Sequence, residues 1–530
     1  MAMNVLITDA VAQACIDLLD VAGIHPDVQL KKSPDELKAL APQADGWIIR
    51  SGTTITADLI EAADRLKVIG RAGVGVDNID LEAATRRGVL VINAPDGNTI
   101  STAEHTCAML LSLARHIPQA NASLASGKWE RKAFTGSELE EKTLGILGLG
   151  KIGRAVASRM LAFGMRVIGY DPVMSREAAE RMGITLASID EVLEQSDFIT
   201  VHTPLNDMTR GLLNSKTLAR CKHGVRVVNC ARGGIVDEMA LLEALESGQV
   251  GGAALDVYSQ EPPPAALEKL LQHPNLVATP HIAASTEEAQ EKVARQITEQ
   301  VVLALQGKPV MSPVNGMAIR MAAQPEVQPF LTLAAKLGRV AAQLLEGNVE
   351  TLMVRCYGDV PHRYAEVISV AALSGLLGAL LTEPVNLINA PVLAESMGLR
   401  VEEQRAPSHD SFTNLIEVVV GSGKRSRLVG GTVFDRNDPR LARVDDYDVE
   451  VRLEGRLLFY ANEDRPGMVA AVGGILADAN INIGVLQLGR KGGRGSMALT
   501  ALSVDDDIPQ AVLNKISDLK GVQGVRLVQV

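Results

Sequence analysis

The sequence predicts an α/β protein built on two doubly wound parallel sheets and continued by two smaller α+β domains. Short β-branched runs alternate with amphipathic stretches in two series, the first beginning with NVLITDA at residue 4 and the second at Lys142. Strand, helix and strand repeated in this way is typical of a parallel sheet covered on both faces. Because 530 residues exceed what one hydrophobic core can organise, we expect several domains. A ligand is expected in the cleft between the two sheet units.

Most strands and two long helices of this α/β part can be located from short runs. The strand-like runs are NVLITDA, GWIIRSG, LKVIGRAG and VLVINAP in the first series, and KTLGILGLG, RVIGYDP, SDFITVHTP, VRVVNCARGG, GGAALDVYS and NLVATPH in the second. Apolar periodicity from Ser101 to Trp129 predicts one long helix, and Ser101 with Glu104 fits a capping box at its start. A second long helix is predicted over 285–307.

The chain beyond residue 316 predicts two further domains. Residues 317–345 are rich in Ala, Leu and Met, and 365–400 keep an apolar helical spacing, so we place a middle domain at 317–452. From 455 to 530 the order is strand, helix, strand, strand, helix, strand. This order predicts a ferredoxin-like domain, with both helices on one face of an antiparallel sheet.

Charge and composition restrict the possible functions. The net charge of −11 argues against a nucleic-acid or anionic-membrane partner, because such surfaces repel an acidic protein. The longest uncharged run, Val367 to Leu381, is shorter than the roughly 20 residues that span a bilayer. The five cysteines show no CxxC spacing, and the N-terminus lacks a signal-peptide pattern. We therefore predict a cytoplasmic protein with reduced cysteines and no metal site.

A glycine-rich turn at the start of the second series predicts a dinucleotide site. The motif consists of Gly148, Gly150 and Gly153, with Lys151 and Ile152 between the last two glycines. It has G-x-G-x-x-G spacing, follows a strand and opens a helix. Glycines permit a tight turn and a close approach of backbone amides to a pyrophosphate, and a helix N-terminus favours negative charge. The spacing alone also fits a glycine-rich turn without a ligand.

A carboxylate completes the dinucleotide pattern. Asp171 ends the next strand, about twenty residues after the glycines, where a carboxylate accepts hydrogen bonds from ribose hydroxyls. The same carboxylate would repel a 2′-phosphate, although Arg176 nearby is a feature that would suit NADP. We predict NAD, bound by a Rossmann-type domain.

Three predicted strand ends carry the groups that alcohol oxidation requires. The reaction needs a base for the hydroxyl proton, a cation for a substrate carboxylate, and a carboxylate that holds the base in one tautomer. His281, Arg232 and Glu261 fit these roles, each in a turn that follows a strand. Each also has an ordinary alternative: a surface histidine, a salt-bridged arginine and a turn-capping glutamate. Their joint placement in one unit favours catalysis.

The segments around these residues resemble those of the D-2-hydroxyacid dehydrogenase family over about residues 1–315. The matching runs are GLGKIG, YDP, NCARGGIVDE, ALDVYSQEPP and TPHIAAS. The resemblance implies that Arg232 binds the substrate carboxylate, His281 is the acid/base and Glu261 pairs with it. It also implies a set of residues around NAD beyond the glycine motif, namely Thr203, Cys230, Ala231, Arg232, Asp256 and His281.

The same resemblance implies the domain layout. A Rossmann-type cofactor domain at 98–282 would be inserted in a flavodoxin-like substrate domain made of 1–97 plus 283–315. The two long helices at the junctions would then serve as hinges and dimer contacts.

Two loops, RSGTTIT and GKWERKAF, resemble those of the phosphoglycerate dehydrogenase branch of the family. A phosphorylated substrate requires cations beyond Arg232, because a buried phosphate dianion is costly unless it is paired. The substrate-binding candidates are Arg50, Ser51, Arg71, Gly73 and Arg131. The resemblance implies 3-phosphoglycerate as substrate, a homodimer or homotetramer, and a reach of Arg131 into the neighbouring subunit's site.

The C-terminal domain resembles an ACT domain. The likeness lies in NEDRPG, between the first strand and helix, and INI, which opens the second strand. Such domains bind amino acids at paired interfaces, and in this branch the effector is L-serine, the product of the pathway. The resemblance implies that Asn462, Asp464 and Asn482 contact serine. The middle domain resembles the regulatory, substrate-binding-like domain of the long enzymes, and its ligand is not readable from the sequence.

Three alternatives have different consequences. A glyoxylate, hydroxypyruvate or D-lactate type reductase would act on substrates without phosphate. The C-terminal-binding corepressors share the dinucleotide fold, but they do not explain an ACT-like tail. A pure amino-acid sensor with an inactive catalytic half is disfavoured because Arg232, Glu261 and His281 are all present.

Overall fold

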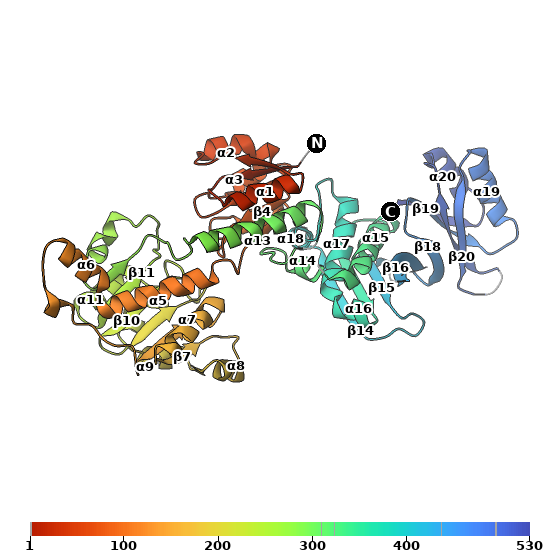
Figure 1. Cartoon of the computed structure of the whole chain (residues 1–530). Helices are drawn as coiled ribbons and strands as arrows, with labels where there is room; N and C mark the ends of the chain where they lie inside the picture. The colour runs from red at the N-terminus through yellow and green to blue at the C-terminus, as the bar shows by residue number, and fades with distance from the viewer. Residues whose placement is uncertain (1–2, 309, 323, 436, 493–494) are drawn as a thin grey trace. The chain divides into compact units, whose positions relative to one another are not determined.

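The computed structural model describes residues 3–308, 310–322, 324–435, 437–492 and 495–530, which form four sheets (Figure 1). The chain divides into two compact units. Unit 1 contains Met1–Ala10, Ile16–Asn93 and Ile297–Val530, and unit 2 contains Val11–Cys15 and Ala94–Gln296. In the part of the chain that the structure describes, no helix is both long and apolar enough to cross a membrane.

The first sheet, in unit 1, has five parallel strands in the order β2-β1-β3-β4-β5. Strands β1, β3 and β4 are almost wholly buried, as expected for a sheet covered on both faces. The 2-1-3-4-5 order is flavodoxin-like, and it confirms the fold predicted for the first series. Its strands are β1 (Asn4–Ile7), β2 (His25–Val28), β3 (Gly46–Ile49), β4 (Val68–Arg71) and β5 (Leu90–Asn93), and its helices are α1 (Gln13–Val21), α2 (Pro34–Leu40), η1 (Ala41–Gln43), α3 (Ala57–Ala62) and α4 (Leu81–Arg86).

The second sheet, in unit 2, has seven parallel strands in the order β12-β11-β10-β9-β6-β7-β8. The order reverses between β6 and β9, and this topological switch point is where Rossmann-type sheets bind their ligand. Helix α5 packs on β10 and β11 and against α7 (Figure 1). The strands are β6 (Thr143–Leu147), β7 (Arg166–Tyr170), β8 (Ile184–Leu186), β9 (Phe198–Val201), β10 (Val225–Asn229), β11 (Val250–Leu255) and β12 (Leu276–Ala278). The helices are α5 (Thr99–Arg115), α6 (Ile117–Ala125), η2 (Arg131–Phe134), α7 (Lys151–Ala162), α8 (Arg176–Arg181), α9 (Ile189–Gln195), α10 (Ser215–Leu218), α11 (Glu238–Glu246), η3 (Ala265–Leu267) and α12 (Glu268–Leu271).

The long helix predicted from Ser101 to Trp129 is in fact two helices, α5 and α6. His116 between them has a φ of 52°, a left-handed conformation that ends α5, and Pro118 lies in the first turn of α6. The predicted capping box is wrong as well. Helix α5 begins before Ser101, whose hydroxyl donates to the carbonyl oxygen of Asn98 at 3.0 Å. By contrast, the helix predicted over 285–307 is confirmed as α13 (Glu287–Leu305).

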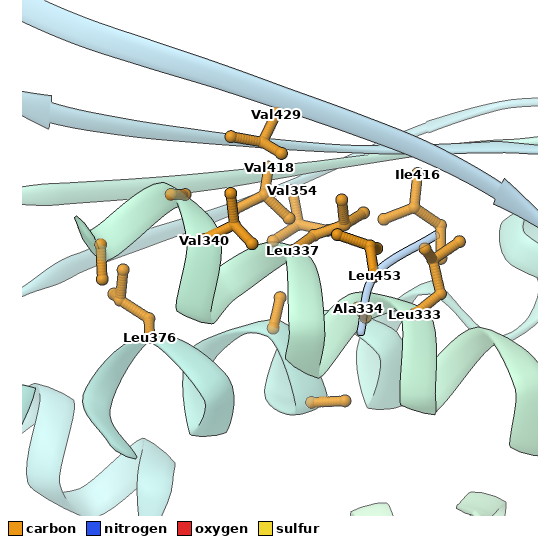
Figure 2. Packing of buried hydrophobic residues seen from close by; sticks show 14 of the residues in the cluster. Leu333, Ala334, Leu337, Val340, Val354, Leu376, Ile416, Val418, Val429 and Leu453 are labelled. Atoms are coloured by element: carbon orange, nitrogen blue, oxygen red, sulfur yellow. The ribbon is translucent and has the colours of Figure 1, made fainter. Parts of the chain in front are cut away.

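The middle domain is a mixed six-stranded sheet with helices on one face. Strands β13 and β14 are parallel and the other pairs are antiparallel, in the order β14-β13-β15-β16-β17-β18. Figure 2 shows Leu337 and Val340 of α15 pointing toward Val354, Val418 and Val429 of the sheet. The elements are α14 (Met317–Ala322), η4 (Pro325–Val327), α15 (Gln328–Leu344), β13 (Thr351–Tyr357), α16 (Asp359–Arg363), α17 (Ala365–Leu380), α18 (Ala390–Ser396), β14 (Arg400–Ala406), β15 (Leu415–Ser422), β16 (Arg425–Phe434), β17 (Asp438–Val444) and β18 (Tyr447–Arg452).

Helices α15 and α17 approach each other so closely that only glycine fits at the contact. A Cβ added to Gly375 would lie 1.8 Å from the carbonyl oxygen of Ala335, and one added to Gly338 would lie 2.0 Å from that of Ala372. Gly378, one turn further along α17, has open space at its Cβ position among the described residues. The predicted apolar helix of this domain therefore packs backbone to backbone on its neighbour.

The C-terminal domain has the predicted βαββαβ order. Its antiparallel sheet runs β20-β21-β19-β22. Apolar residues of both helices, such as Leu476 and Ile516, bury one face of this sheet. The elements are β19 (Arg456–Glu463), α19 (Met468–Asp478), β20 (Ile483–Arg490), β21 (Met497–Val504), α20 (Gln510–Ser517) and β22 (Val522–Gln529).

Candidate active site

The glycine motif forms a tight turn at the switch point of the second sheet. Gly148 follows β6 with a φ of 99°, where an added Cβ would lie 2.6 Å from the carbonyl oxygen of His202. A Cβ on Gly153 would lie 2.1 Å from the carbonyl oxygen of Gly148, so α7 packs directly on the turn. Gly150 is the N-cap residue of α7, and no described atom lies within 4 Å of its Cβ position. The turn therefore leaves open space where the helix N-terminus would receive a phosphate.

The two residues between the last glycines have different environments. Lys151 is exposed and forms an ion pair with Asp96, whereas Ile152 packs against the core of unit 2. An exposed pair of this kind contributes little stability.

A buried polar pair after β9 faces the same switch point. The hydroxyl of Thr203 and Nδ1 of His202 are buried and have no hydrogen-bond partner among the described residues. Burial lowers the pKa of His202 to about 4, so its ring is neutral at physiological pH. Unsatisfied buried polar atoms are costly, and a ligand that bonds to them relieves the cost. The site thus fits a dinucleotide that carries polar groups to this point.

Asp171 lies just after β7, beside the glycine turn. One carboxylate oxygen accepts the backbone N–H of Leu149 at 2.9 Å, and the other accepts those of Val173 and Met174 at 2.9 and 3.1 Å. These bonds fix the carboxylate next to the motif, in the position expected for a ribose contact.

The loop after β10 carries Arg232. The side chain of Asn229, which is 1% exposed, accepts the N–H of Ala231 at 3.0 Å and donates to the carbonyl oxygen of Arg232 at 2.9 Å. The guanidinium of Arg232 donates to the carbonyl oxygen of Ala231 at 2.7 Å. A Cβ on Gly233 would lie 1.8 Å from the carbonyl oxygen of Tyr258. This loop therefore packs backbone to backbone on the loop that carries Glu261.

Glu261 and His281 form a direct pair. Nδ1 of His281 lies 2.6 Å from Oε2 of Glu261, and the N–H of Tyr258 donates to the other carboxylate oxygen at 3.2 Å. Burial tends to raise the pKa of Glu261, but the hydrogen bond and charge of His281 hold it below its usual value. The carboxylate thus holds Nδ1 and leaves Nε2 of the imidazole for another partner.

Two further predicted cofactor residues are buried beside this pair. Burial raises the pKa of the Cys230 thiol to about 12, so it is neither a nucleophile nor a charge at neutral pH. Asp256 is 0% exposed and accepts hydrogen bonds from Thr279, Ile282 and Ala283, on either side of His281. Asp256 thus organises the segment that carries the imidazole.

The substrate-binding candidates of unit 1 meet at the carboxyl ends of two neighbouring strands. Arg50 follows β3, and Arg71 ends β4. The Asn78 side chain joins them, because its amide donates to the carbonyl oxygen of Arg50 at 2.7 Å and its oxygen accepts Nε of Arg71 at 3.3 Å. Gly73 lies against this guanidinium, since an added Cβ would be 2.1 Å from Nη1 of Arg71, and Ser51 is exposed.

Arg131 lies in unit 2, in a segment whose side chains are largely exposed. It is exposed at the start of η2, after helix α6, which has no buried residue. Exposed apolar side chains, including Ile117, Leu124 and Trp129, lie along the same segment.

The effector candidates do not meet within one C-terminal domain. Asn462 and Asp464 lie at the end of β19, which pairs with the start of β21. Asn482 precedes β20, whose start pairs with the end of β21, and its amide donates to Asp505 at 2.6 Å. The two positions are therefore at opposite ends of the sheet, roughly 20 Å apart along an eight-residue strand.

The Asn462 and Asp464 side chains already have partners. The oxygen of the buried Asn462 accepts the Thr500 hydroxyl at 2.8 Å. Nε of Arg490 forms an ion pair with Asp464 at 3.0 Å.

Asn229, Tyr258, Thr279 and His105 belong to the site, although the sequence did not single them out. The Tyr258 hydroxyl donates to the carbonyl oxygen of Thr279 at 3.1 Å. Nε2 of His105, on α5, lies 3.3 Å from the Thr279 hydroxyl. Asn229, Tyr258 and Thr279 stood inside the quoted strand-end segments and could have been found there, whereas nothing local pointed to His105.

Three family models match the chain. Residues 107–283 match the NAD binding domain of the D-isomer specific 2-hydroxyacid dehydrogenases. Residues 326–445 match the D-3-phosphoglycerate dehydrogenase intervening domain, and residues 456–521 match the ACT domain.

Curated relatives match almost the whole chain. The D-3-phosphoglycerate dehydrogenase of Archaeoglobus fulgidus is 43% identical over 98% of this chain and 98% of its own length. That of Synechocystis is 41% identical over 98% of this chain and 93% of its own length. The chain belongs to the D-3-phosphoglycerate dehydrogenase family. Within this family it is of the long form, with intervening and ACT domains.

Solved structures resemble the catalytic part of this family member. A D-lactate dehydrogenase from Aquifex aeolicus, complexed with NAD and lactic acid, has a TM-score of 0.53 and 29% identity over 57% of this chain and 96% of that one. A glyoxylate reductase from Paecilomyes thermophila has a TM-score of 0.55 and 30% identity, over 59% of this chain and 98% of that one. The two-sheet catalytic part is thus shared with dehydrogenases that are named for different substrates.

Proposed function

We propose that this chain oxidises D-3-phosphoglycerate to 3-phosphohydroxypyruvate with NAD, as the first step of serine biosynthesis. In this reaction the C2 hydroxyl loses its proton and the C2 hydrogen leaves with its electron pair, so that NADH and a proton are formed. The proposal rests on the Glu261–His281 pair of 2.6 Å, which lies in the same unit as the dinucleotide turn. Identity to D-3-phosphoglycerate dehydrogenases along nearly the whole chain supports the substrate.

The catalytic roles follow from what each side chain can do. Nδ1 of His281 is held by Glu261, so Nε2 is the atom that takes the hydroxyl proton. Glu261 then stabilises the imidazolium by its negative charge. Arg232 binds the substrate carboxylate, for which a planar guanidinium offers two parallel N–H donors.

NAD is the cofactor, and its nicotinamide ring supplies the acceptor for the C2 hydride. Gly148, Gly150 and Gly153 would hold the pyrophosphate with Lys151 and Ile152. Asp171 would bind the ribose, and Thr203 would donate to a polar group through its hydroxyl, which has no hydrogen-bond partner among the described residues. Cys230, Ala231 and Asp256 would line the nicotinamide side.

Substitution of the base tests the catalytic assignment. We expect His281→Asn to reduce NAD reduction by 3-phosphoglycerate by at least about a hundredfold, because general-base catalysis contributes 10² or more. NAD affinity should change by less than about threefold, because asparagine keeps a polar side chain beside the cofactor and only the proton acceptor is lost. His223→Asn, at an exposed position in the same unit, is the matched control. Undiminished turnover by His281→Asn would remove the assignment.

The substrate assignment depends on cations for the phosphate. We propose that Arg50, Ser51, Arg71 and Gly73 form this part of the site, with Arg131 contributed by a neighbouring subunit. Arg50→Met should raise the KM for 3-phosphoglycerate by about tenfold or more, because a charge-assisted hydrogen bond is lost. Arg86→Met is the control, since Arg86 forms an exposed helix pair with Glu82.

Comparison of substrates separates the proposal from its nearest alternative. The test compares 3-phosphoglycerate with D-glycerate and D-lactate, each with NAD, and with glyoxylate in the presence of NADH. If a substrate without phosphate were turned over as efficiently as 3-phosphoglycerate, the proposed function would be replaced by that of a reductase without phosphate specificity.

We also propose that L-serine inhibits the enzyme through the ACT domain, with contacts from Asn462, Asp464 and Asn482. Inhibition requires that serine bind one arrangement of the domains better than another. The exposed apolar segment around α6 supports a homodimer or homotetramer, because such side chains are normally covered by a partner. All five cysteines are free and buried, which supports the reducing cytoplasm as the location.

A further inference from the structure

We propose that His105 is a positioning residue for the base His281, acting through Thr279 and Asp256. The inference rests on the proposed catalytic role of His281 and extends it to a helix outside the strand-end loops. All four residues belong to unit 2.

Asp256 is the centre of the arrangement. Its Oδ1 accepts the Thr279 hydroxyl at 2.6 Å and the N–H of Ile282 at 2.9 Å, and its Oδ2 accepts the N–H of Ala283 at 2.9 Å. The carboxylate thus binds the chain two residues before His281 and one and two residues after it. Because Asp256 is 0% exposed, water does not compete for these bonds.

These hydrogen bonds to Asp256 hold His281 in a backbone conformation that is otherwise unfavourable. Its φ is 53°, in the left-handed region that is unfavourable for residues with a Cβ. Such a conformation persists only where the surroundings determine it on both sides. The direction of the imidazole, and hence the position of Nε2, therefore depends on the bonds to Asp256.

His105 supplies the remaining side-chain donor. Its Nε2 lies 3.3 Å from the Thr279 hydroxyl oxygen and 3.4 Å from Oδ1 of Asp256. The Thr279 hydroxyl has one proton, which it donates to the closer and charged Asp256 at 2.6 Å. Its oxygen is then an acceptor, so Nε2 of His105 carries a hydrogen and donates. His105 thereby orients the hydroxyl toward Asp256.

A simple packing role would not require this residue. The side chain of His105 is 18% exposed. The buried positions of the same helix hold apolar residues such as Met109 and small polar ones such as Thr106, none of them with a ring that could reach the Thr279 hydroxyl in this way. The imidazole of His105 lies beside the Thr279 hydroxyl oxygen and Oδ1 of Asp256, both of which can accept its hydrogen. A leucine at this position would donate to neither oxygen. Burial tends to raise the pKa of Asp256, and the bonds from His105, Thr279 and the two amides hold it below the usual value.

A series of substitutions at position 105 tests the donor. The amide nitrogen of glutamine reaches about the position of Nε2, whereas that of asparagine ends near Nδ1. We expect His105→Asn and His105→Leu to lower kcat by about tenfold or more, because a hydrogen bond to a charged cluster is lost and His281 moves. The KM values for NAD and 3-phosphoglycerate should stay within about twofold, and His105→Gln should recover kcat to within about threefold of wild type.

A double-mutant cycle tests the route through Thr279. Thr279→Val removes the hydroxyl, so adding His105→Asn to it should lower kcat by less than about twofold further. Thr279→Ser keeps the hydroxyl and should stay close to wild type. Thermal unfolding midpoints of all variants, measured on the full chain, separate loss of fold from loss of position.

The outcomes are distinct. Wild-type kcat in His105→Asn, equal losses in the Gln and Asn variants, or fully additive losses with Thr279→Val would each overturn the positioning role. If His281→Asn itself keeps full turnover, the proposed base is wrong. If His281→Asn is inactive while His105→Asn is fully active, only the positioning inference fails.

Discussion

The close approach of the Arg232 and Glu261 loops makes Gly233→Ala a sharp test of the site. An added Cβ would lie 1.8 Å from the carbonyl oxygen of Tyr258 and 2.0 Å from its carbonyl carbon, both of them backbone atoms that no side-chain rotation can move. Ordinary contact begins near 3.4 Å, so the two loops must separate by about 1.6 Å. Overpacking of this kind costs about 1–3 kcal/mol of stability.

The larger effect is on turnover. A displacement of about 1 Å between catalytic groups costs on the order of a hundredfold in rate, because the reacting geometry is lost. We therefore expect kcat/KM for 3-phosphoglycerate to fall by about a hundredfold in Gly233→Ala, measured by NADH absorbance, while NAD affinity changes by less than about threefold. Gly378→Ala in α17, where no described atom lies within 4 Å of the Cβ position, controls for a general effect of alanine. Wild-type kcat/KM in Gly233→Ala would refute the argued contact between the loops.

Three further predictions concern stability and the charged groups. Gly375→Ala should destabilise the middle domain by about 1–3 kcal/mol in urea unfolding, because its Cβ would meet the Ala335 carbonyl oxygen at 1.8 Å, whereas Gly378→Ala should be neutral or stabilising by up to about 1 kcal/mol. Glu261→Gln should lower kcat by about tenfold. This is the low end of the range for a charge-assisted hydrogen bond, because both side chains of the pair are over a third exposed. A kcat above half of the wild-type value would contradict the pairing. Asp256→Asn should cost about 1–3 kcal/mol of unfolding free energy at neutral pH, because the amide leaves a buried N–H unpaired. The pKa of Asp256 is lowered in the folded state, so its charge stabilises the fold at pH values above the ordinary pKa of about 3.8. The difference in unfolding free energy between wild type and Asp256→Asn should therefore decrease as the pH falls below that value. A difference that does not depend on pH would contradict a charged Asp256 in the folded protein.

Local sequence patterns were enough to predict the four-sheet architecture. Most strands of the parallel sheets are short apolar runs between turn residues, which can be located without tertiary information. Strands β2 (HPDV) and β8 (ITL) were missed, because β2 is too polar and β8 is too short to stand out from the loops around them. The glycine turn was located for the same reason, because Gly148 to Gly153 are contiguous. The break at His116 was missed because the hydrophobic period continues across it, although Pro118 two residues later is a local signal of a new helix start.

The candidate site could be assembled from the sequence only where its residues follow strands. Arg232, Glu261 and His281 follow strands of one sheet, and parallel strands bring their carboxyl ends together. His105 is one of several polar residues of α5, and its partner Thr279 is 174 residues away along the chain. Nothing in a helical period distinguishes such a residue from one that faces solvent, so only the packing of α5 on the sheet could identify it.

The separation of Asn462 and Asn482 at opposite ends of one small sheet has a consequence for control of the enzyme. If serine contacts both side chains, as proposed above, it must lie between two copies of the chain. Ligand occupancy and self-association would then be thermodynamically linked, each promoting the other by mass action. Under that proposal, inhibition by serine should weaken on dilution, and the enzyme should respond most strongly where it is most concentrated.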